Sequence, residues 1–126
     1  MNTPVNFEIA KLLKEKGFNL KVRYSYGHSI NPHIAYPNED FAISCDFNSP
    51  NMGRNWKHLY SAPTIAEVVM WLYKKRGIWI SVDPENDTDT WFFTISYNNS
   101  ETIFGNYSTP TEVYEAAIEY ALKELI

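Results

Sequence analysis

A five-residue segment occurs twice in this chain of 126 residues and constrains its fold more than any other feature. The segment YSAPT at residues 60–64 returns as YSTPT at residues 107–111, and a helical pattern follows each copy. A Ser or Thr hydroxyl caps free N–H groups at a helix start, where proline has no N–H to leave unpaired. In the second copy, Thr109 and Glu112 also have the spacing of a capping box. Each copy therefore predicts the start of a helix.

A second repeat marks the other end of the predicted helices. LLKEKGFNLKV at residues 12–22 parallels LYKKRGIWISV at residues 72–82. In both, basic residues suit the negative end of a helix, and a glycine, Gly17 or Gly77, supplies the stop. An alternating strand pattern then begins. The two repeats together predict one domain, residues 1–126, with a duplicated unit at about 7–76 and 77–126.

The predicted fold class is α+β, in the order α-βββ-α-βββ-α, with antiparallel meanders packed with three helices. The predicted strands either alternate apolar and polar residues or take the same position in the other repeat unit. They are 19–26, 41–47, 55–60, 78–82, 91–97 and 102–107. The turns at 83–90 and 98–101 are rich in Pro, Asn and Asp. Short turns between consecutive strands predict antiparallel pairing.

The first unit is longer than the second, and the excess is best placed in the loop GHSINPHIAYPNED at residues 27–40, with residues 48–55 as a second place for it. Long loops within compact domains are often functional. His28, His33 and Tyr36 are therefore the candidate functional residues of this loop. The bland interpretation, in which both histidines are ordinary surface residues, remains open.

No residue pattern predicts catalysis, a metal or a cofactor. Cys45 shares its predicted strand face with Phe41, Ile43 and Phe47, which favours a buried, unreactive thiol. The histidines and Cys45 lack zinc-motif spacing. The acidic turn at 83–90 lacks the glycine and the closing glutamate of a calcium loop. Phosphate-binding and hydrolase motifs are also missing, so we do not expect an enzyme. Paired carboxylates for sugar hydrolysis stay open as an alternative, because their meeting depends on the fold.

The compartment is predicted from the cysteine count and from the N-terminus. A single cysteine allows no internal disulfide, which fits a reducing cytoplasm. The start of the sequence lacks the pattern of a secretion signal. The longest nearly apolar stretch, residues 65–73, is far too short for a membrane span. We therefore expect a cytoplasmic protein without a membrane partner.

About the last two-thirds of the chain resembles known proteins. It lies in the helix start at 63–64, the apolar run at 67–72, the GIWISV strand at 77–82 and the last helix at 111–126. This pattern resembles a group of small uncharacterised proteins from phages and mobile elements of gut bacteria. The resemblance implies a cytoplasmic accessory protein, and it implies no catalytic residue.

Two surfaces stand out as unusual. The middle helix is apolar almost all round, at residues 65–73, which predicts that it is covered on more than one side. The second sheet has apolar residues on both faces, although helices on one side need only one. Trp79, Phe92 and Phe104 are the candidate interface, an exposed aromatic sheet face for a homodimer or another protein partner. The alternative is that loops or the first helix cover these rings.

The charge distribution supports a second hypothesis. Residues 1–82 hold ten Lys/Arg against six Asp/Glu, whereas residues 83–126 hold one against nine. Segments of opposite charge that are simply solvated would explain this, but a basic surface also suits nucleic acid. The candidate contacts are Lys21, Arg23, Arg54 and Lys57. The sequence thus predicts a non-enzymatic, self-associating interaction protein, with a nucleic-acid-binding accessory protein as the alternative.

Overall fold

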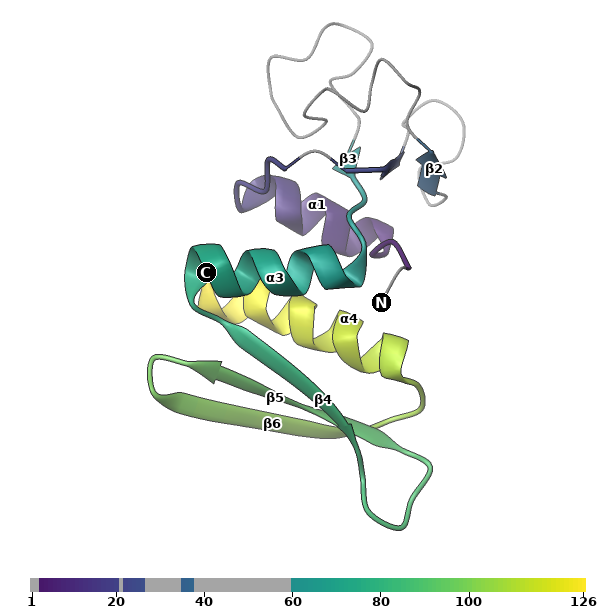
Figure 1. Cartoon of the computed structure of the whole chain (residues 1–126), viewed down its shortest axis with the longest axis vertical. Helices are drawn as coiled ribbons and strands as arrows, with labels where there is room; N and C mark the ends of the chain where they lie inside the picture. Colours follow the sequence, from purple (N-terminus) through teal and green to yellow (C-terminus); the bar gives the residue numbers. More distant parts are fainter. Residues whose placement is uncertain (1–2, 21, 27–34, 38–59) are drawn as a thin grey trace, which may run out of the picture. The chain divides into compact units, whose positions relative to one another are not determined.

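The computed structural model in Figure 1 describes residues 3–20, 22–26, 35–37 and 60–126 of the chain. The chain forms two compact units, Asn2–Thr64 and Ile65–Ile126, and each is described by itself. The described residues contain three α-helices and two small antiparallel sheets. The predicted α+β class is therefore confirmed.

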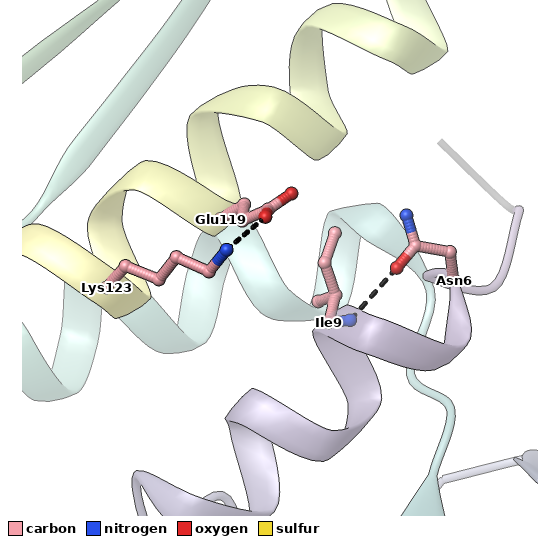
Figure 2. A network of polar contacts seen from close by, with 4 residues as sticks. All are labelled: Asn6, Ile9, Glu119 and Lys123. Carbon is pink, nitrogen blue, oxygen red and sulfur yellow. Dashed lines mark hydrogen bonds and ion pairs between the residues drawn. The ribbon is translucent and has the colours of Figure 1, made fainter.

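The helix of the first unit, α1 (Phe7–Glu15), has a polar start and a glycine stop. The Asn6 side chain accepts a hydrogen bond from the Ile9 N–H at 2.9 Å, as Figure 2 shows. At the other end, Gly17 has φ 89°, and the Phe18 N–H donates to the Leu13 carbonyl at 2.9 Å. Glycine adopts this left-handed backbone without the strain that a Cβ causes. The predicted glycine stop is confirmed here.

The first sheet consists of β1 (Tyr24–Tyr26), β2 (Ala35–Pro37) and β3 (Tyr60–Ser61), in the order β2-β1-β3. In a meander, the second strand in the sequence lies in the middle, but here β1 lies between β2 and β3. These three strands are therefore not the meander that the sequence predicts. The strand predicted at 41–47 lies outside the described residues. The strand β2 lies within the segment 27–40 that is predicted to be a loop. The segment has no alternating pattern, and it is a strand because it pairs with β1.

The N-terminal segment is tied to this sheet. The Val5 N–H donates to the Pro63 carbonyl at 2.9 Å, and the Tyr26 hydroxyl donates to the Val5 carbonyl at 2.7 Å. The Phe7 ring makes edge contacts with the Tyr26 and Tyr60 rings, each at 5.5 Å between centroids. Val5 is fully buried. Residues distant in sequence therefore form one small core in this unit.

The second unit begins with α3 (Ile65–Arg76) and continues with three strands, a last helix and a π-helical turn. These are β4 (Trp79–Pro84), β5 (Trp91–Tyr97), β6 (Ser100–Tyr107), α4 (Pro110–Tyr120) and the π-helical turn η2 (Ala121–Leu125). The strands form an antiparallel meander in the order β4-β5-β6, as predicted. Asn98 and Asn99, with φ 51° and 63°, form the two-residue turn that joins β5 to β6. Asparagine tolerates the left-handed backbone that such hairpin turns require.

The predicted start of the last helix is confirmed. The Thr109 hydroxyl accepts from the Glu112 N–H at 3.2 Å, and the Glu112 carboxylate accepts from the Ser108 N–H at 3.2 Å. Near the far end, Lys123 and Glu119 form an exposed ion pair at 2.6 Å (Figure 2). Such exposed pairs contribute about 0.3–0.5 kcal/mol.

The core of the second unit lies where α4 packs on β4 and β5. Ile80 pairs with Ile95, and Val82 pairs with Phe93, so these four residues share one face of the sheet. Ile80, Ile95 and Phe93 are buried, as is Ala117 of α4. The side chains of this face therefore exclude water between sheet and helix.

The helix α3 has one exposed side. Ile65, Val68 and Leu72 are buried, but Met70 is 42% exposed and Tyr73 is 52% exposed. The side of α3 that bears Met70 and Tyr73 is therefore exposed, and the prediction that α3 is covered on more than one side stays a prediction. An apolar residue can face water without a partner, since folded proteins expose much apolar surface.

The predicted duplication stays a prediction. Gly77 has φ 68° after α3, just as Gly17 has a positive φ after α1. The two sheets, however, differ in pairing order among the described strands. The shared helix stops support the repeat, and the shared part does not extend to the way the strands pair.

Candidate interaction surface

The three residues of the predicted aromatic interface lie on both faces of the second sheet. Phe104 pairs directly with Phe93, so both lie on the face toward α4, where Phe104 contacts the Tyr120 ring at 5.2 Å between centroids. Phe92 and Trp79 lie on the opposite, open face, because side chains alternate along a strand. The structure therefore brings two of the three to one face and separates Phe104 from them.

The reason for this separation is strand register. The Asn98–Asn99 turn pairs Tyr97 with Ser100 and so sets every later pair of the hairpin. A slip of one residue would move the whole apolar set of β6 to the other face. The sequence shows that β6 has apolar residues at 103 and 104, but the face of each depends on that register.

The open face is not a continuous aromatic patch. Ser81 and Thr94 lie between Trp79 and Phe92, and Ser96 pairs directly with Trp79. Trp79 itself, 42% exposed, contacts the Tyr73 ring of α3 at 5.3 Å between centroids. The exposed aromatic surface on this side is therefore limited to Trp79 and Tyr73 at the start of β4 and does not extend over the sheet face.

The most exposed large apolar residue of the described chain lies on β6. Ile103 is 61% exposed, and its neighbour Phe104 is 41% exposed. Of the described strands, only β5 pairs with β6, so β6 is an edge of its sheet (Figure 1). It is eight residues long and contains no proline. An edge strand offers main-chain N–H and C=O groups to another strand.

The last part of β6 carries a bulge that a carboxylate stabilises. Trp91 pairs with Tyr107 and Phe93 with Phe104, so β6 has one extra residue between these pairs. Asn106 has φ 73° there, and its N–H donates to Glu85 Oε1. Glu85 follows β4 and reaches back to β6 from the turn. Bulges of this kind twist a strand edge and limit its pairing.

Gly105 leaves the space that this carboxylate occupies. A Cβ at Gly105 would lie 2.8 Å from Glu85 Oε1 and 3.4 Å from the Phe92 Cβ. The first distance is too short for any real contact, so a larger residue would move the Glu85 side chain. The glycine therefore places a carboxylate over the open face of β6.

We expect Gly105→Ala to displace the Glu85 carboxylate and break its hydrogen bond to Asn106. The expected loss is about 1 kcal/mol in the free energy of unfolding, the usual contribution of one hydrogen bond. Urea denaturation measures it, with Glu85→Ala as the second background. In that background Gly105→Ala should cost much less, because no carboxylate remains to displace. An equal cost in both backgrounds would contradict this assignment.

Most residues of the other two predicted sites lie outside the described part of the chain. These are His28, His33, Lys21, Arg54 and Lys57. Tyr36 lies in β2, where it pairs with Ser25, and Arg23 is exposed just before β1. The functional loop and the nucleic-acid contacts therefore stay predictions, as does the burial of Cys45.

The acidic turn between β4 and β5 closes on itself. The Glu85 N–H donates to the Thr90 carbonyl at 2.9 Å, and the Thr88 and Thr90 hydroxyls lie 2.8 Å apart. Asp87 has φ 59° at its tip. Within the described residues, no three His, Cys, Asp or Glu side chains are arranged to hold a metal ion. Within this turn, the Glu85 carboxylate has a structural role as the acceptor of the Asn106 N–H, and Glu85 belongs to no metal-binding sequence motif.

Comparison of the chain with protein-family models, with curated proteins and with solved structures finds no match. Among the helices of the described residues, none has the length and apolar character needed to cross a bilayer. The surface of the described residues, and above all the edge of β6, is therefore the basis for proposing a function.

Proposed function

We propose that this chain is a protein-interaction protein and that the edge of β6 is its binding strand. The observation that carries this proposal is the 61% exposure of Ile103 near the middle of an edge strand of eight residues. Natural proteins usually cover or charge such a strand. Strand addition to an exposed edge is a common way to bind another protein, because main-chain hydrogen bonds supply affinity and side chains supply specificity.

The features around Ile103 fit a binding strand with a defined end. The bulge at Asn106 limits pairing in the last part of β6, and the Asn98–Asn99 turn limits it at the start. Phe104 widens the apolar surface on the face toward α4. Four parts of the proposal rest on the sequence and not on β6: the non-enzymatic accessory role, the phage or mobile-element origin, self-association and the cytoplasmic location.

Ile103→Lys is expected to abolish binding through β6, because it replaces the central apolar contact with a charge. Leu20→Lys is the matched control, since Leu20 is 43% exposed, lies outside β6 and receives the same charge. Sedimentation over a range of concentrations measures self-association, and quantitative pull-down from the cells that make the protein measures other partners. Circular dichroism checks that both variants fold.

The proposal requires that wild type and Leu20→Lys behave alike and that Ile103→Lys loses an association. If all three remain monomeric and capture the same proteins, β6 is not a binding strand. If Leu20→Lys loses the same association as Ile103→Lys, net charge rather than β6 is responsible, and the proposal fails.

A further inference from the structure

Three groups follow the open face of β6 at alternate positions. Glu101 and Ile103 are two residues apart on the strand and therefore share this face. At the next position on the same face, Gly105 has no side chain, and the Glu85 carboxylate occupies the space beside it. The exposed edge thus presents a carboxylate, an apolar side chain and a second carboxylate in that order.

The charge of the surrounding chain has a single sign. Residues 77–122 contain eight Asp or Glu and no Lys, Arg or His. Two copies that paired through β6 would bring Glu101 and the Glu85 carboxylate of each copy close together, and residues 77–122 supply no cation to offset them. Like charges across a strand pair are destabilising, and opposite charges are stabilising. A second copy is therefore a poor occupant of this edge, and a cationic strand is a good one.

We propose that β6 binds an extended, cationic segment of another protein, with the side-chain order cation, apolar, cation at alternate positions. This inference rests on the proposed function and names its partner. Residues directly opposite on paired strands have Cβ atoms about 5 Å apart. The two cations of the partner then face Glu101 and the Glu85 carboxylate, and its apolar residue faces Ile103.

The test is a titration of the full chain, labelled with ¹⁵N, with three synthetic peptides. The first, Thr-Lys-Thr-Val-Thr-Lys-Thr, carries the proposed pattern. The second has glutamate in place of both lysines. The third has proline in place of the two residues that flank valine, which keeps the charge but removes two N–H donors from the strand.

We expect the first peptide to shift the amide signals of residues 101–106 and to bind about tenfold more tightly than either of the others. The glutamate peptide changes two cross-strand pairs from attraction to repulsion, and the proline peptide lacks two main-chain hydrogen bonds. Either change accounts for a difference of this size. The double variant Glu85→Gln/Glu101→Gln should lose several-fold affinity for the first peptide. Glu67→Gln/Glu124→Gln is its control, because it removes two exposed carboxylates that lie on helices rather than beside β6.

Equal binding of the glutamate peptide, or of the proline peptide, would overturn the inference, because charge or strand pairing would then not select the partner. If no peptide binds but the chain forms a dimer that Ile103→Lys alone dissociates, the occupant is a second copy. In that case this inference fails and the proposed function stands. If no peptide binds and Ile103→Lys changes no association, both fail.

Discussion

Phe93→Ala is expected to lower the free energy of unfolding by about 3–5 kcal/mol, the usual cost of removing a buried phenylalanine ring. Phe93 is 1% exposed, and its ring contacts Phe104 at 5.3 Å and Tyr107 at 5.9 Å between centroids. The lost ring would leave a cavity between the sheet and α4 that the neighbours refill only in part. Urea or thermal denaturation, followed by circular dichroism, measures the loss.

The directly paired residue provides the control. Phe104 is the same residue type on the same face, but it is 41% exposed. Phe104→Ala should therefore cost less than half as much as Phe93→Ala, since less apolar area returns to water. Equal losses for the two variants would mean that the open edge of β6 is covered in solution, and the binding strand proposed above would then already be occupied.

Leu13→Ala is expected to cost about 2–5 kcal/mol in the first unit, because Leu13 is fully buried on α1. Leu20, which follows α1 and is 43% exposed, supplies a variant of the same chemistry. Leu20→Ala should change the free energy of unfolding by less than about 1 kcal/mol. Denaturation followed by far-ultraviolet circular dichroism measures both. A loss from Leu20→Ala as large as that from Leu13→Ala would contradict the burial described for α1.

The sequence predicts those parts of the fold that local chemistry determines. The glycine stop at Gly17, the Thr109 side-chain cap and the strand at 91–97 need only neighbouring residues, and the structure has all three. The pairing of β1 with β3 depends on residues far apart in the chain, and no local pattern contains that information. The meander prediction holds for the second sheet because short turns join its strands, and a short turn favours pairing between consecutive strands.

The candidate site was harder to predict than the fold. That β6 has apolar residues at 103 and 104 is visible in the sequence, but that β6 is an edge, and that Ile103 shares its face with Glu101, depends on the sheet order and register. The role of Glu85 depends on a contact with a strand 21 residues later. Alternation of Glu101 and Ile103 along the strand is the signal that could have drawn attention to this edge.

The hydrogen bond between Val5 and Pro63 also has a consequence for engineering. Together with the antiparallel bridge between Pro4 and Thr64, it places the beginning and the end of the first unit side by side. A unit whose two ends meet can be grafted into a surface loop of a host protein without stretching the host backbone. The segment from Pro4 to Thr64 therefore has the geometry of a portable insert.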